Sequence, residues 1–597
     1  MIKPYFADFD DITPPKIDNM SEQRLRLWHI SAGVVIGLAL WYLQWRWTVS
    51  LNPKAMIFSI TVALAETMIF IGTILFFYDI WCEKETPKSP PPKTRSDLHL
   101  GGDGNIYVDL FVTTVDEGAD LVSPSIIDAK ALNIPAGVSL SIYVLDDGNR
   151  DSMRQLAKNH HVGYLSRQDN IGYKAGNLRN ALLQTKGDFV VICDADTRVF
   201  PGFLQNTLGY FRDAKTAWVQ TPHWFYDIPQ GETWDNSLAR VLKAPRPGLA
   251  RLMRFLTGNN IIGRDPFLSD PVIFFDVIQR RRNRNNASFC CGAGSIHRRE
   301  AIFANALQSK SQNIARLNGM LNTDDAGAGA QLVQIEPFKF HVSEDIFTSI
   351  QLHSRGWHSV FHPDIEARML SPWTMKAWST QRLKYAGGTY DIMLRANPIF
   401  RRGMPWQTKL HYAATFWSYL SVLWLPILLF APVISLMTGL APVKAYSFEF
   451  FMHFLPLLLV NEFAMYVACK GYNTHGGRML AVSAFPLQLR GLWQVLRRKK
   501  LGFPPTPKTL FARKQLGFVY SSMFILAVFA ASVGFGIWAF KMRVPGYSYS
   551  LLIVNFFWIF WNSFPFIKII SMSLWNPEKG RPCGQNNTMN KDISYAQ

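Results

Sequence analysis

The chain has 597 residues, of which 48% are hydrophobic and only 18% are charged. Ordinary soluble domains have about 25% charged residues, so this composition excludes a disordered chain and argues against a purely soluble one. The net charge of +19 at pH 7 indicates an anionic partner, such as lipid headgroups, a phosphorylated substrate or nucleic acid. The 19 Trp and 43 Phe residues fit a membrane protein better than a nucleic-acid binder, so no nucleic-acid partner is expected.

Apolar runs that are long enough to cross a bilayer lie at both ends of the chain. About 20 apolar residues span the hydrocarbon layer, and such runs occupy residues 30–49, 56–78, 412–440, 451–468, 516–540 and 551–570. Glu66 falls inside the second run. We expect it to face protein or a polar cavity, or to pair with a neighbouring residue, because a lone carboxylate in lipid is costly.

The distribution of lysine and arginine predicts the orientation in the membrane. The loops 441–449 and 541–550 hold few cations, whereas 470–514 holds Arg478, Arg490, Arg497, Arg498, Lys499, Lys500, Lys508 and Arg513. Cytoplasmic loops carry the excess of Lys and Arg. The sequence therefore predicts a multi-pass protein of the inner (plasma) membrane, with both termini and the long central region in the cytoplasm.

The central region has the pattern of an α/β domain. A Pro-rich linker at 84–95 cannot form a helix. Short β-prone runs follow at 106–113, 139–145 and 188–193, and a helical pattern at 176–184 precedes the third run. Strands that alternate with helices predict a parallel sheet.

Acidic residues come directly after two of these predicted strands. Asp146 and Asp147 follow the second run, and Asp194 and Asp196 follow the third. Ligands of parallel sheets bind at the carboxyl ends of strands. If the chain stays extended, Asp194 and Asp196 lie on one side, where two carboxylates can hold a divalent cation that also binds substrate phosphates. Lys174, before the helical pattern, is either a phosphate or carboxylate partner or a solvated loop lysine.

Three further charged groups of residues have two interpretations each. Glu344 and Asp345 precede a helical pattern at 346–354; they can cap that helix or raise the pKa of one carboxyl through like-charge coupling. Gln381, Lys384 and Tyr385 share a helix face, in an amphipathic helix at the membrane surface or on the cytoplasmic domain. A solvated or lipid-facing surface is expected, in preference to a polyanion site, for Arg280, Arg281, Arg282 and Arg284.

Ten short motifs follow one another along the chain: TTVDE, LDDG, KAGN, CDADT, QTPHWF, SFCCG, SEDIFTSIQLHSRGW, STQRLKYAGG, NPIFRRG and FPPTPKT. This series of motifs resembles the processive family 2 glycosyltransferases, and most closely the bacterial cellulose synthase catalytic subunits. The resemblance runs from about residue 108 to the last apolar run. It implies a GT-A-like α/β glycosyltransferase domain in the cytoplasm, joined to an α-helical transmembrane bundle of about six spans.

The resemblance also implies roles for individual residues. Asp345 would be the catalytic base, and Asp194 and Asp196 would bind Mg²⁺ (or Mn²⁺) together with the diphosphate. Thr114, Glu117 and Asp146 would contact the uridine part of the donor, and Lys174 would support the nucleotide. His223 would line the sugar and acceptor site, and Glu344 would also bind substrate. The acceptor-binding loop would be shaped by Phe289, Cys291 and Gly292, and the position of the family's QxxRW motif would be taken by Gln381, Lys384 and Tyr385. A gating loop that closes over UDP would contain Phe503, Thr506 and Lys508.

The implied activity is that of a processive, inverting hexosyltransferase. It would polymerise glucose from UDP-glucose into a β-linked, cellulose-like glucan and extrude the glucan through the bundle. The implied partners are the UDP-sugar donor, the growing glucan acceptor, the lipid bilayer and a periplasmic or regulatory subunit. The alternatives are a synthase of a β-1,3-glucan, mixed-linkage or amino-sugar polymer, and a transport or scaffold protein with a degenerate transferase domain.

Some positions depart from the family pattern. Lys384 and Tyr385 stand where the family has Arg and Trp, and lysine lacks the bidentate fork of arginine. The gating loop reads FPPTPK, with two prolines that stiffen it. An insertion at about 308–336 has no counterpart that we can place. These departures concern the acceptor and hence the linkage, and they leave donor binding largely unchanged.

The expected organisation has nine parts. They are a cytoplasmic tail (1–29), two transmembrane helices (30–80), a Pro-rich linker (81–104), the GT-A-like domain (105–370), amphipathic interface helices (371–410), two transmembrane helices (411–470), an interface helix with the gating loop (471–515), two transmembrane helices (516–571) and a cytoplasmic tail (572–597) without room for a PilZ-type cyclic-di-GMP-binding domain.

Overall fold

The computed structural model describes most of the chain. The described residues are 5–228, 232–257, 261–262, 267, 271–321, 334–372, 374–444, 446, 448–498 and 516–575. The predicted gating-loop residues Phe503, Thr506 and Lys508, most of the tail at 572–597 and the middle of the 308–336 insertion lie outside them.

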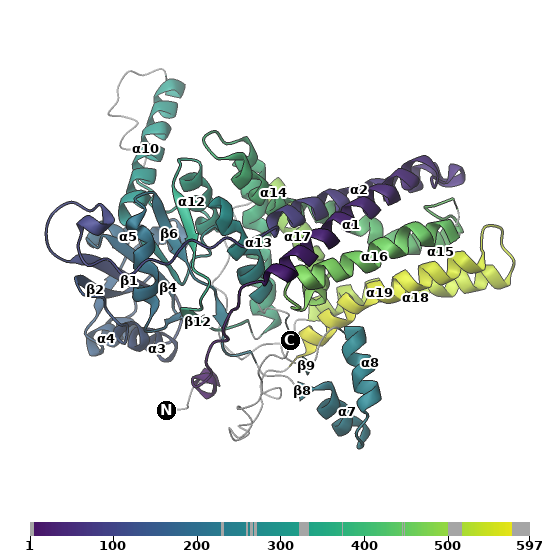
Figure 1. Cartoon of the computed structure of the whole chain (residues 1–597), viewed down its shortest axis with the longest axis horizontal. Coiled ribbons are helices and arrows are strands. Elements are labelled where there is room, and N and C mark those ends of the chain that lie inside the picture. Colours follow the sequence, from purple (N-terminus) through teal and green to yellow (C-terminus); the bar gives the residue numbers. More distant parts are fainter. Residues whose placement is uncertain are drawn as a thin grey trace.

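A sheet-containing domain and a bundle of long helices lie at opposite ends of the molecule (Figure 1). The domain contains a seven-stranded sheet of order β11-β6-β10-β4-β1-β2-β3. Its strands are β1 (Ile106–Thr114), β2 (Val138–Asp146), β3 (Gly163–Ser166), β4 (Phe189–Asp194), β6 (Thr216–Gln220), β10 (Ser295–Arg298) and β11 (His358–Phe361). Small sheets are formed by β5 (Arg198–Val199), β12 (Ala367–Met369) and β7 (Trp224–Phe225), and by β8 (Glu232–Thr233) and β9 (Ile261–Ile262).

The sheet is mixed, which differs from the parallel sheet that the sequence predicts. β1 pairs in parallel with β2 and β4, whereas β10 runs antiparallel to both β4 and β6. The three runs that the sequence singles out are β1, β2 and β4. β4 is apolar on both faces, and its first five residues are buried, as expected for a strand that helices cover on both sides. The antiparallel β10 was missed because its four residues carry no apolar alternation.

Helices surround the sheet on both faces. They include α3 (Ala119–Lys130), α4 (Asp151–Asn159), α5 (Tyr173–Gln184), α6 (Phe203–Thr207), α10 (Arg299–Leu321) and α12 (Glu344–His353). α5 covers one face, where Ala175, Leu178 and Leu182 join a buried cluster with Val190 and Ile192 of β4. α10 contains the first part of the 308–336 insertion and projects away from the domain (Figure 1).

The described residues contain six candidate membrane spans, judged by length and composition. They are Glu22–Thr48, Pro53–Asp79, Trp406–Thr438, Phe448–Ala468, Leu516–Lys541 and Tyr549–Leu574. The helices in them are α1 (Glu22–Thr48), α2 (Met56–Asp79), α14 (Trp406–Leu420), α15 (Leu425–Thr438), α16 (Phe448–Ala468), α18 (Leu516–Lys541) and α19 (Tyr549–Leu574). Each span overlaps one of the six runs that the sequence predicts.

Glu66 inside the second span is paired. Its Oε2 atom accepts a hydrogen bond from Nε of Arg46 at 2.7 Å, and the Arg46 side chain is fully buried between α1 and α2. Arg46 also donates to the carbonyl oxygen of Pro442 at 3.0 Å. A carboxylate in this position is thus neutralised by a neighbouring helix, as expected for a charge inside a membrane.

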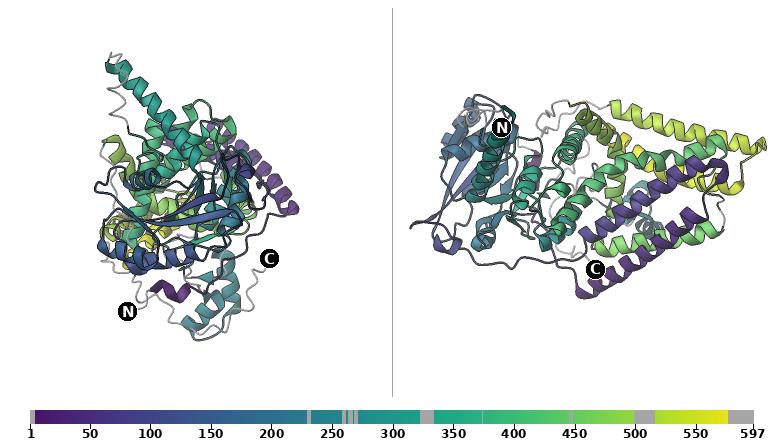
Figure 2. Two further views of the ribbon diagram at one scale, coloured as in Figure 1. Left: turned by 90° about the vertical axis from the view of Figure 1, so that its left-hand side faces the viewer. Right: turned by 90° about the horizontal axis from the view of Figure 1, so that it is seen from above.

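Two helices lie between the sheet domain and the bundle. α13 (Met375–Arg395) and α17 (Thr474–Leu496) pack against one another, and the views in Figures 1 and 2 place α13 at the junction of the two parts. Ala386 and Tyr390 of α13 belong to a buried cluster that also contains Ile350 of α12 and Tyr412 of α14. α13 therefore connects the domain core to the bundle.

The arginine run is buried, so the prediction of a solvated or lipid-facing surface is wrong. A π-helix at Ile273–Gln279 continues into α9 (Arg280–Arg282), and the three α9 arginines are each at most 3% exposed. We call residues 273–285 the connector. Its arginines are buried because they are paired with acids and carbonyl groups from distant parts of the chain, which the run itself does not reveal.

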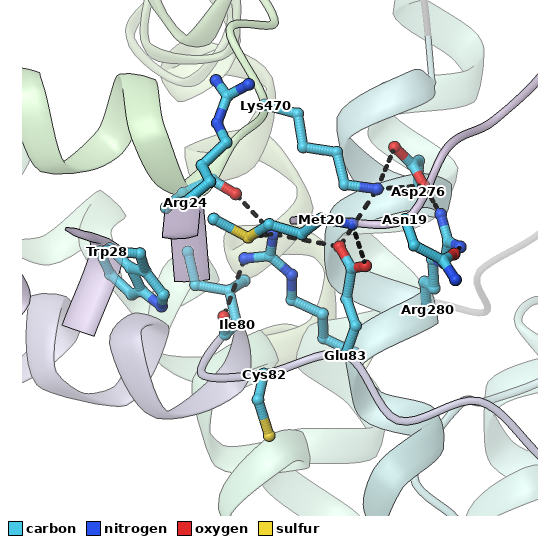
Figure 3. Close-up of polar contacts among 12 residues, drawn as sticks. Asn19, Met20, Arg24, Trp28, Ile80, Cys82, Glu83, Asp276, Arg280 and Lys470 are labelled. Atoms are coloured by element: carbon cyan, nitrogen blue, oxygen red, sulfur yellow. Dashed lines mark hydrogen bonds and ion pairs between the residues drawn. The ribbon is translucent and has the colours of Figure 1, made fainter. Parts of the chain in front are cut away.

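The partners of the connector come from the ends of the membrane helices and from the segments next to them (Figure 3). Arg282 donates to both carboxylate oxygens of Asp79, at 2.8 and 2.6 Å, and Asp79 also contacts Nδ1 of His411 at 2.6 Å. Arg281 donates to the carbonyl oxygens of Ile80 and Ala468, at 2.8 and 2.6 Å. The connector thus holds the ends of α2 and α16 together beside the sheet domain.

The same region fixes the segment that precedes α1. Arg280 pairs with Asp276 at 2.7 Å and contacts Asn19, and Lys470 pairs with both Asp276 and Glu83 at 3.1 Å. Figure 3 shows Asn19 and Met20 next to these side chains. A buried ion cluster of this kind is costly to form, but the loss of one partner strongly destabilises the folded protein. The cluster therefore holds these segments in one arrangement.

Candidate active site

The register of the sheet brings the predicted donor-site residues into one row. Thr114 at the end of β1 pairs with Asp146 at the end of β2. On its other side β1 pairs with β4, with Thr113 opposite Asp194. The carboxyl ends of three neighbouring parallel strands therefore meet at one edge, which is where such sheets bind ligands.

Thr114, Glu117 and Asp146 form a hydrogen-bonded group at this edge. The Thr114 hydroxyl donates to Oε2 of Glu117 at 2.8 Å. Asp146 is fully buried and accepts hydrogen bonds from the backbone N–H of Gly148 at 3.0 Å and from Nη2 of Arg150 at 2.9 Å. The Asp146 carboxylate thus holds the turn after β2 in place as well as lying at the site.

Arg150 joins this group and was missed by the sequence reasoning. Its Nη2 atom also donates to the Thr114 hydroxyl at 2.8 Å, and its Nη1 atom donates to the carbonyl oxygen of Glu117. One guanidinium therefore links the ends of β1 and β2. The available local signal was a cation four residues after Asp146, directly before α4.

The chain turns after Asp194, so the expectation of an extended continuation is wrong. The backbone N–H of Thr197 donates to the carbonyl oxygen of Asp194 at 2.9 Å. The two carboxylates consequently have different surroundings. The Asp194 side chain is 48% exposed, whereas Asp196 is buried and accepts a hydrogen bond from the backbone N–H of Leu370 at 3.1 Å. Both still act electrostatically on the His223 ring.

The donor set at Asp194 and Asp196 fits a magnesium ion only as part of a complex with substrate. No group of three or more His, Cys, Asp or Glu side chains that could hold a metal is found within the described residues. Mg²⁺ is usually bound through one or two carboxylates together with substrate phosphates. Two carboxylates at the edge of the sheet, one of them half-exposed, match that requirement.

Lys174 lies in the middle of the site. It forms an ion pair with Asp194, and burial alone would lower its pKa. The charges of Asp194, Glu344 and Asp345 outweigh burial and raise the pKa of Lys174 above its usual value. Lys174 is therefore a permanently charged group that lies between the carboxylates of Asp194 and Asp196 and the start of α12. The interpretation as a solvated loop lysine is wrong.

Residues 288–294 form a loop between the connector and β10 that faces this lysine. Gly292 has φ +89°, and a Cβ atom placed on it would lie 3.7 Å from Oδ2 of Asp345 and 3.8 Å from Nζ of Lys174. A side chain at this position would enter the space between the Asp345 carboxylate and the Lys174 ammonium. The positive φ also favours glycine. Gly292 thus keeps the space between Asp345 and Lys174 open.

The end of β6 holds this loop from the other side. Oε1 of Gln220 accepts a hydrogen bond from the backbone N–H of Cys291 at 2.8 Å. Nε2 of His223 donates to the carbonyl oxygen of Ala293 at 2.8 Å. Burial lowers the pKa of His223 to about 4, although Asp194 and Asp196 act in the opposite direction. His223 is therefore neutral at pH 7, with one ring nitrogen committed to the loop.

Asp345 has the properties of a general base. It occupies the first turn of α12, and burial, followed by the charge of Glu344, raises the pKa of its carboxyl to about 6. Its Oδ1 atom accepts a hydrogen bond from the backbone N–H of Ile346 at 2.8 Å. The two interpretations of the Glu344–Asp345 pair are therefore both realised, because the acids start the helix and are also coupled. A pKa close to the working pH is what proton abstraction requires.

Helix α13 completes the site with partly exposed residues of its middle turns. Lys384 and Lys174 lower the Asp345 pKa, in opposition to burial. Asp345 and Arg382 both act electrostatically on the Tyr385 hydroxyl. Tyr385 is 43% exposed. Gln381 lies on the same helix, half-buried, one turn earlier.

The connector reaches the site through Gln279. Nε2 of Gln279 donates to the carbonyl oxygen of Phe289 at 3.3 Å and to Sγ of Cys291 at 3.2 Å. The guanidinium carbon of Arg282 lies 5.4 Å from the centre of the Phe289 ring. The loop at 288–294 is thus fixed by β6 on one side and by the connector on the other. Sequence reasoning missed Gln279, and no local pattern signals it.

The mixed sheet with its charged edge has a GT-A-like fold, and the described residues also include six helices that are long and apolar enough to span a membrane. Two comparisons with known families agree. Residues 106–388 match the family described as Glycosyltransferase like family 2, and residues 329–468 match the family described as Cellulose synthase. Residues 106–468 therefore have the sequence pattern of family 2 glycosyltransferases and of cellulose synthases.

Named relatives give the same assignment. The chain is 27% identical over 423 residues to Cellulose synthase 2 of Novacetimonas hansenii. This aligned region covers 70% of this chain and 23% of that protein. It is 26% identical over 440 residues to the UDP-forming cellulose synthase catalytic subunit of Pseudomonas fluorescens. This aligned region covers 72% of this chain and 50% of that protein. The matched region therefore spans half or less of these relatives.

Among solved structures, a mannosyltransferase of Pyrobaculum calidifontis in complex with GDP-Man and Mn²⁺ is similar at 15% identity. The similarity covers 74% of this chain and 99% of that one, with a TM-score of 0.42.

Proposed function

We propose that the protein is a processive, inverting membrane glycosyltransferase. It polymerises glucose from UDP-glucose into a β-linked, cellulose-like glucan and extrudes the glucan through its transmembrane bundle. The observation that supports this best is the juxtaposition at Gly292, where the raised-pKa carboxyl of Asp345 and the ammonium of Lys174 flank one open space. The named relatives, which are cellulose synthases, point to the same chemistry.

The donor would lie along the edge formed by β1, β2 and β4. In this proposal the uridine contacts Thr114 and Glu117, and the diphosphate lies near Asp194, Asp196 and Lys174. A divalent cation, Mg²⁺ or Mn²⁺, would be held by Asp194 and Asp196 and would neutralise charge on the diphosphate. Lys174 adds a fixed positive charge on the side of the diphosphate that faces Asp345, where charge develops on the departing UDP.

The transfer step needs one proton acceptor, and we assign this role to Asp345. The hydroxyl of the terminal glucose of the acceptor attacks C1 of the donor glucose and loses its proton to the Asp345 carboxylate. The bond between C1 and the UDP oxygen breaks, so the configuration at C1 inverts and UDP leaves with the electron pair. The acceptor would stand on the loop at 288–294 and on Tyr385 of α13.

The bundle side of the proposal follows from α13. The helix carries Lys384 and Tyr385 on the side of the base, and its Tyr390 hydroxyl donates to the carbonyl oxygen of Tyr419, in the third span, at 2.9 Å. A chain that is elongated at Asp345 would thus be formed beside the membrane helices. By the distribution of cations, the catalytic domain would lie in the cytoplasm and the spans in the inner membrane. A periplasmic or regulatory subunit remains part of the proposal.

Purified membranes supplied with labelled UDP-glucose and Mg²⁺ or Mn²⁺ test the activity. We expect UDP release together with a high-mass polymer that cellulase digests. If neither UDP nor polymer forms with any of the common UDP-sugars, the proposal is wrong. The UDP-sugar series also tests the donor, because another sugar that supports faster polymerisation would replace glucose.

A second polymer is favoured by one pair of residues. Lys384 and Tyr385 stand where the resembled family has Arg and Trp, and a lysine cannot reproduce the bidentate contacts of an arginine. A smaller aromatic platform would let the acceptor present a different hydroxyl to Asp345, as in a β-1,3-glucan or mixed-linkage synthase. A product that resists cellulase and is digested by β-1,3-glucanase would establish this alternative.

A further inference from the structure

Two short helices, α7 (Trp234–Leu242) and α8 (Pro247–Thr257), form a hairpin between β8 and β9. They pack against one another. Each helix carries leucine or other apolar side chains at spacing i, i+3, i+4, which places them on one face. These are Leu238, Val241 and Leu242 in α7, and Leu249, Leu252 and Met253 in α8.

Part of this apolar face is exposed. Val241 is 65% exposed, Leu242 46%, Leu249 39% and Leu252 49%. Scattered exposed aliphatic residues are ordinary on a soluble surface, but a contiguous set on one amphipathic hairpin indicates a surface that something covers.

The hairpin is also basic, and its cations divide into two groups. Arg240 pairs with Glu232, and Arg254 pairs with Asp235. Lys243, Arg246 and Arg251 are exposed, and within the described part of the chain none of the three has an ion pair or side-chain hydrogen bond. Two of these three cations lie in the turn between the helices, beside the exposed Val241 and Leu242. Unpaired cations next to exposed aliphatic groups are typical of helices that lie in the headgroup region of a bilayer.

The position of the hairpin fits the same environment. Phe267, ten residues after α8, is buried in one cluster with Leu487 of α17 and with Ile569 and Met572 near the end of α19. The chain ten residues after α8 is therefore held at the end of a spanning helix. In Figure 1 α8 lies beside the bundle and runs across the direction of the spans, and the view from above in Figure 2 places it at the level of the bundle rather than of the sheet.

We propose that the α7–α8 hairpin docks on the leaflet of the surrounding bilayer that faces the sheet domain. Val241, Leu242, Leu249 and Leu252 enter the boundary between headgroups and acyl chains, and Lys243, Arg246 and Arg251 bind anionic headgroups. This docking site is separate from the six spans and from the catalytic site. It makes the seating of the sheet domain on the membrane dependent on the charge of the lipid.

The test places an environment-sensitive fluorophore on the hairpin of the full-length protein in lipid nanodiscs. Leu252→Cys carries the label, and Ile127→Cys on α3, which is 52% exposed, is the matched control on the sheet domain. Labelled unsubstituted protein gives the background from native cysteines. The discs contain phosphatidylcholine with brominated acyl chains as a quencher, with or without phosphatidylglycerol.

We expect bromine quenching of the Leu252→Cys label and none at Ile127→Cys. Most of the quenching should be lost in discs without phosphatidylglycerol, because three cations near an anionic leaflet favour the bound state by roughly 100-fold. The triple change Lys243→Glu, Arg246→Glu and Arg251→Glu should cause the same loss in anionic discs. The lipid comparison needs no charge variant, so the result does not depend on how that variant folds.

Two results would overturn the proposal. Equal quenching at Leu252→Cys and Ile127→Cys would show that the hairpin is not in the bilayer. Protection of the Leu252→Cys label from a water-soluble quencher, without bromine quenching, would show that a second copy of the chain or the polymer covers the face instead.

Discussion

The edge of the sheet and the connector both gather charged side chains, but they are built in opposite ways. At the edge of the sheet, Asp194 is half-exposed and pairs with Lys174, which borders the open space at Gly292. In the connector, the three α9 arginines are enclosed, and each carboxylate near them is already paired. Asp194 at the end of β4 remains accessible to a substrate, whereas the charges in the connector hold segments together. Charge density alone therefore does not identify a catalytic site.

The largest effect should come from Asp345 in α12, the residue that we propose as the general base. Asp345→Asn is expected to lower polymer synthesis by about 100- to 10,000-fold, because a general base contributes that much to the rate. UDP release from purified membranes measures it. Asp364→Asn changes a carboxylate whose side chain is 58% exposed, and it serves as the control that should keep its activity. An Asp345→Asn variant with wild-type polymer yield would remove Asp345 from its assigned role.

A change in the connector should act on stability. Asp79→Asn removes the negative charge that faces the buried Arg282 and is expected to cost about 3–5 kcal/mol of unfolding free energy. Thermal unfolding of the purified protein in detergent measures the loss. The matched control is Asp188→Asn, directly before β4, which weakens the ion pair between Asp188 and Arg95. The Arg95 and Asp188 side chains are 15% and 14% exposed. If Asp79→Asn were no more destabilising than Asp188→Asn, the ion pair in the connector would not contribute more to stability than the pair beside β4.

Lys174→Gln tests whether the central cation serves the donor. Loss of a charged hydrogen bond to the diphosphate is worth roughly 1.5–3 kcal/mol, so kcat/KM for UDP-glucose should fall by about 10- to 150-fold. The variant should also move the pH profile to higher pH, because Lys174 lowers the Asp345 pKa. Lys158→Gln, on the exposed side of α4, is the control. An unchanged kcat/KM for Lys174→Gln would contradict the donor role.

The smallest predicted effect is a shift of the pH profile. Asp345 must be ionised to accept a proton, and its pKa is raised to about 6, so activity should rise with pH through about 6 and level off above it. Glu344→Gln removes the like charge that raises this pKa, so the midpoint should move to lower pH while the activity at pH 8 changes little. A midpoint that stays in place, or moves up, would show that the two carboxyls are not coupled.

The edge of the sheet could be predicted from the sequence because its signals are local. Apolar runs at 106–113, 139–145 and 188–193 predict strands, and the acids that follow them lie at the strand ends in the structure. Motif order supplied Asp345 and Lys174. The turn at Asp194 was not predicted, because two acids after a strand are compatible with either an extended chain or a turn.

The parts that were missed depend on contacts between distant residues. Arg282 meets Asp79, and Gln279 meets Cys291, only after the sheet domain has packed against the ends of α2 and α16. Burial of an arginine depends on whether partners from elsewhere offset the loss of hydration. An arginine run has the same local appearance whether it is solvated or enclosed, so the sequence favoured the commoner outcome, which was wrong.

By itself, the sequence determined six apolar segments, an α/β domain between them and the acids at its strand ends. These features follow from hydropathy and periodicity, which are properties of neighbouring residues. Only the tertiary structure decided which charges are buried, how the loop at 288–294 is held and how the base acquires its raised pKa. Each of these depends on the desolvation of a group by segments far away in the chain, and desolvation exists only once the chain has packed.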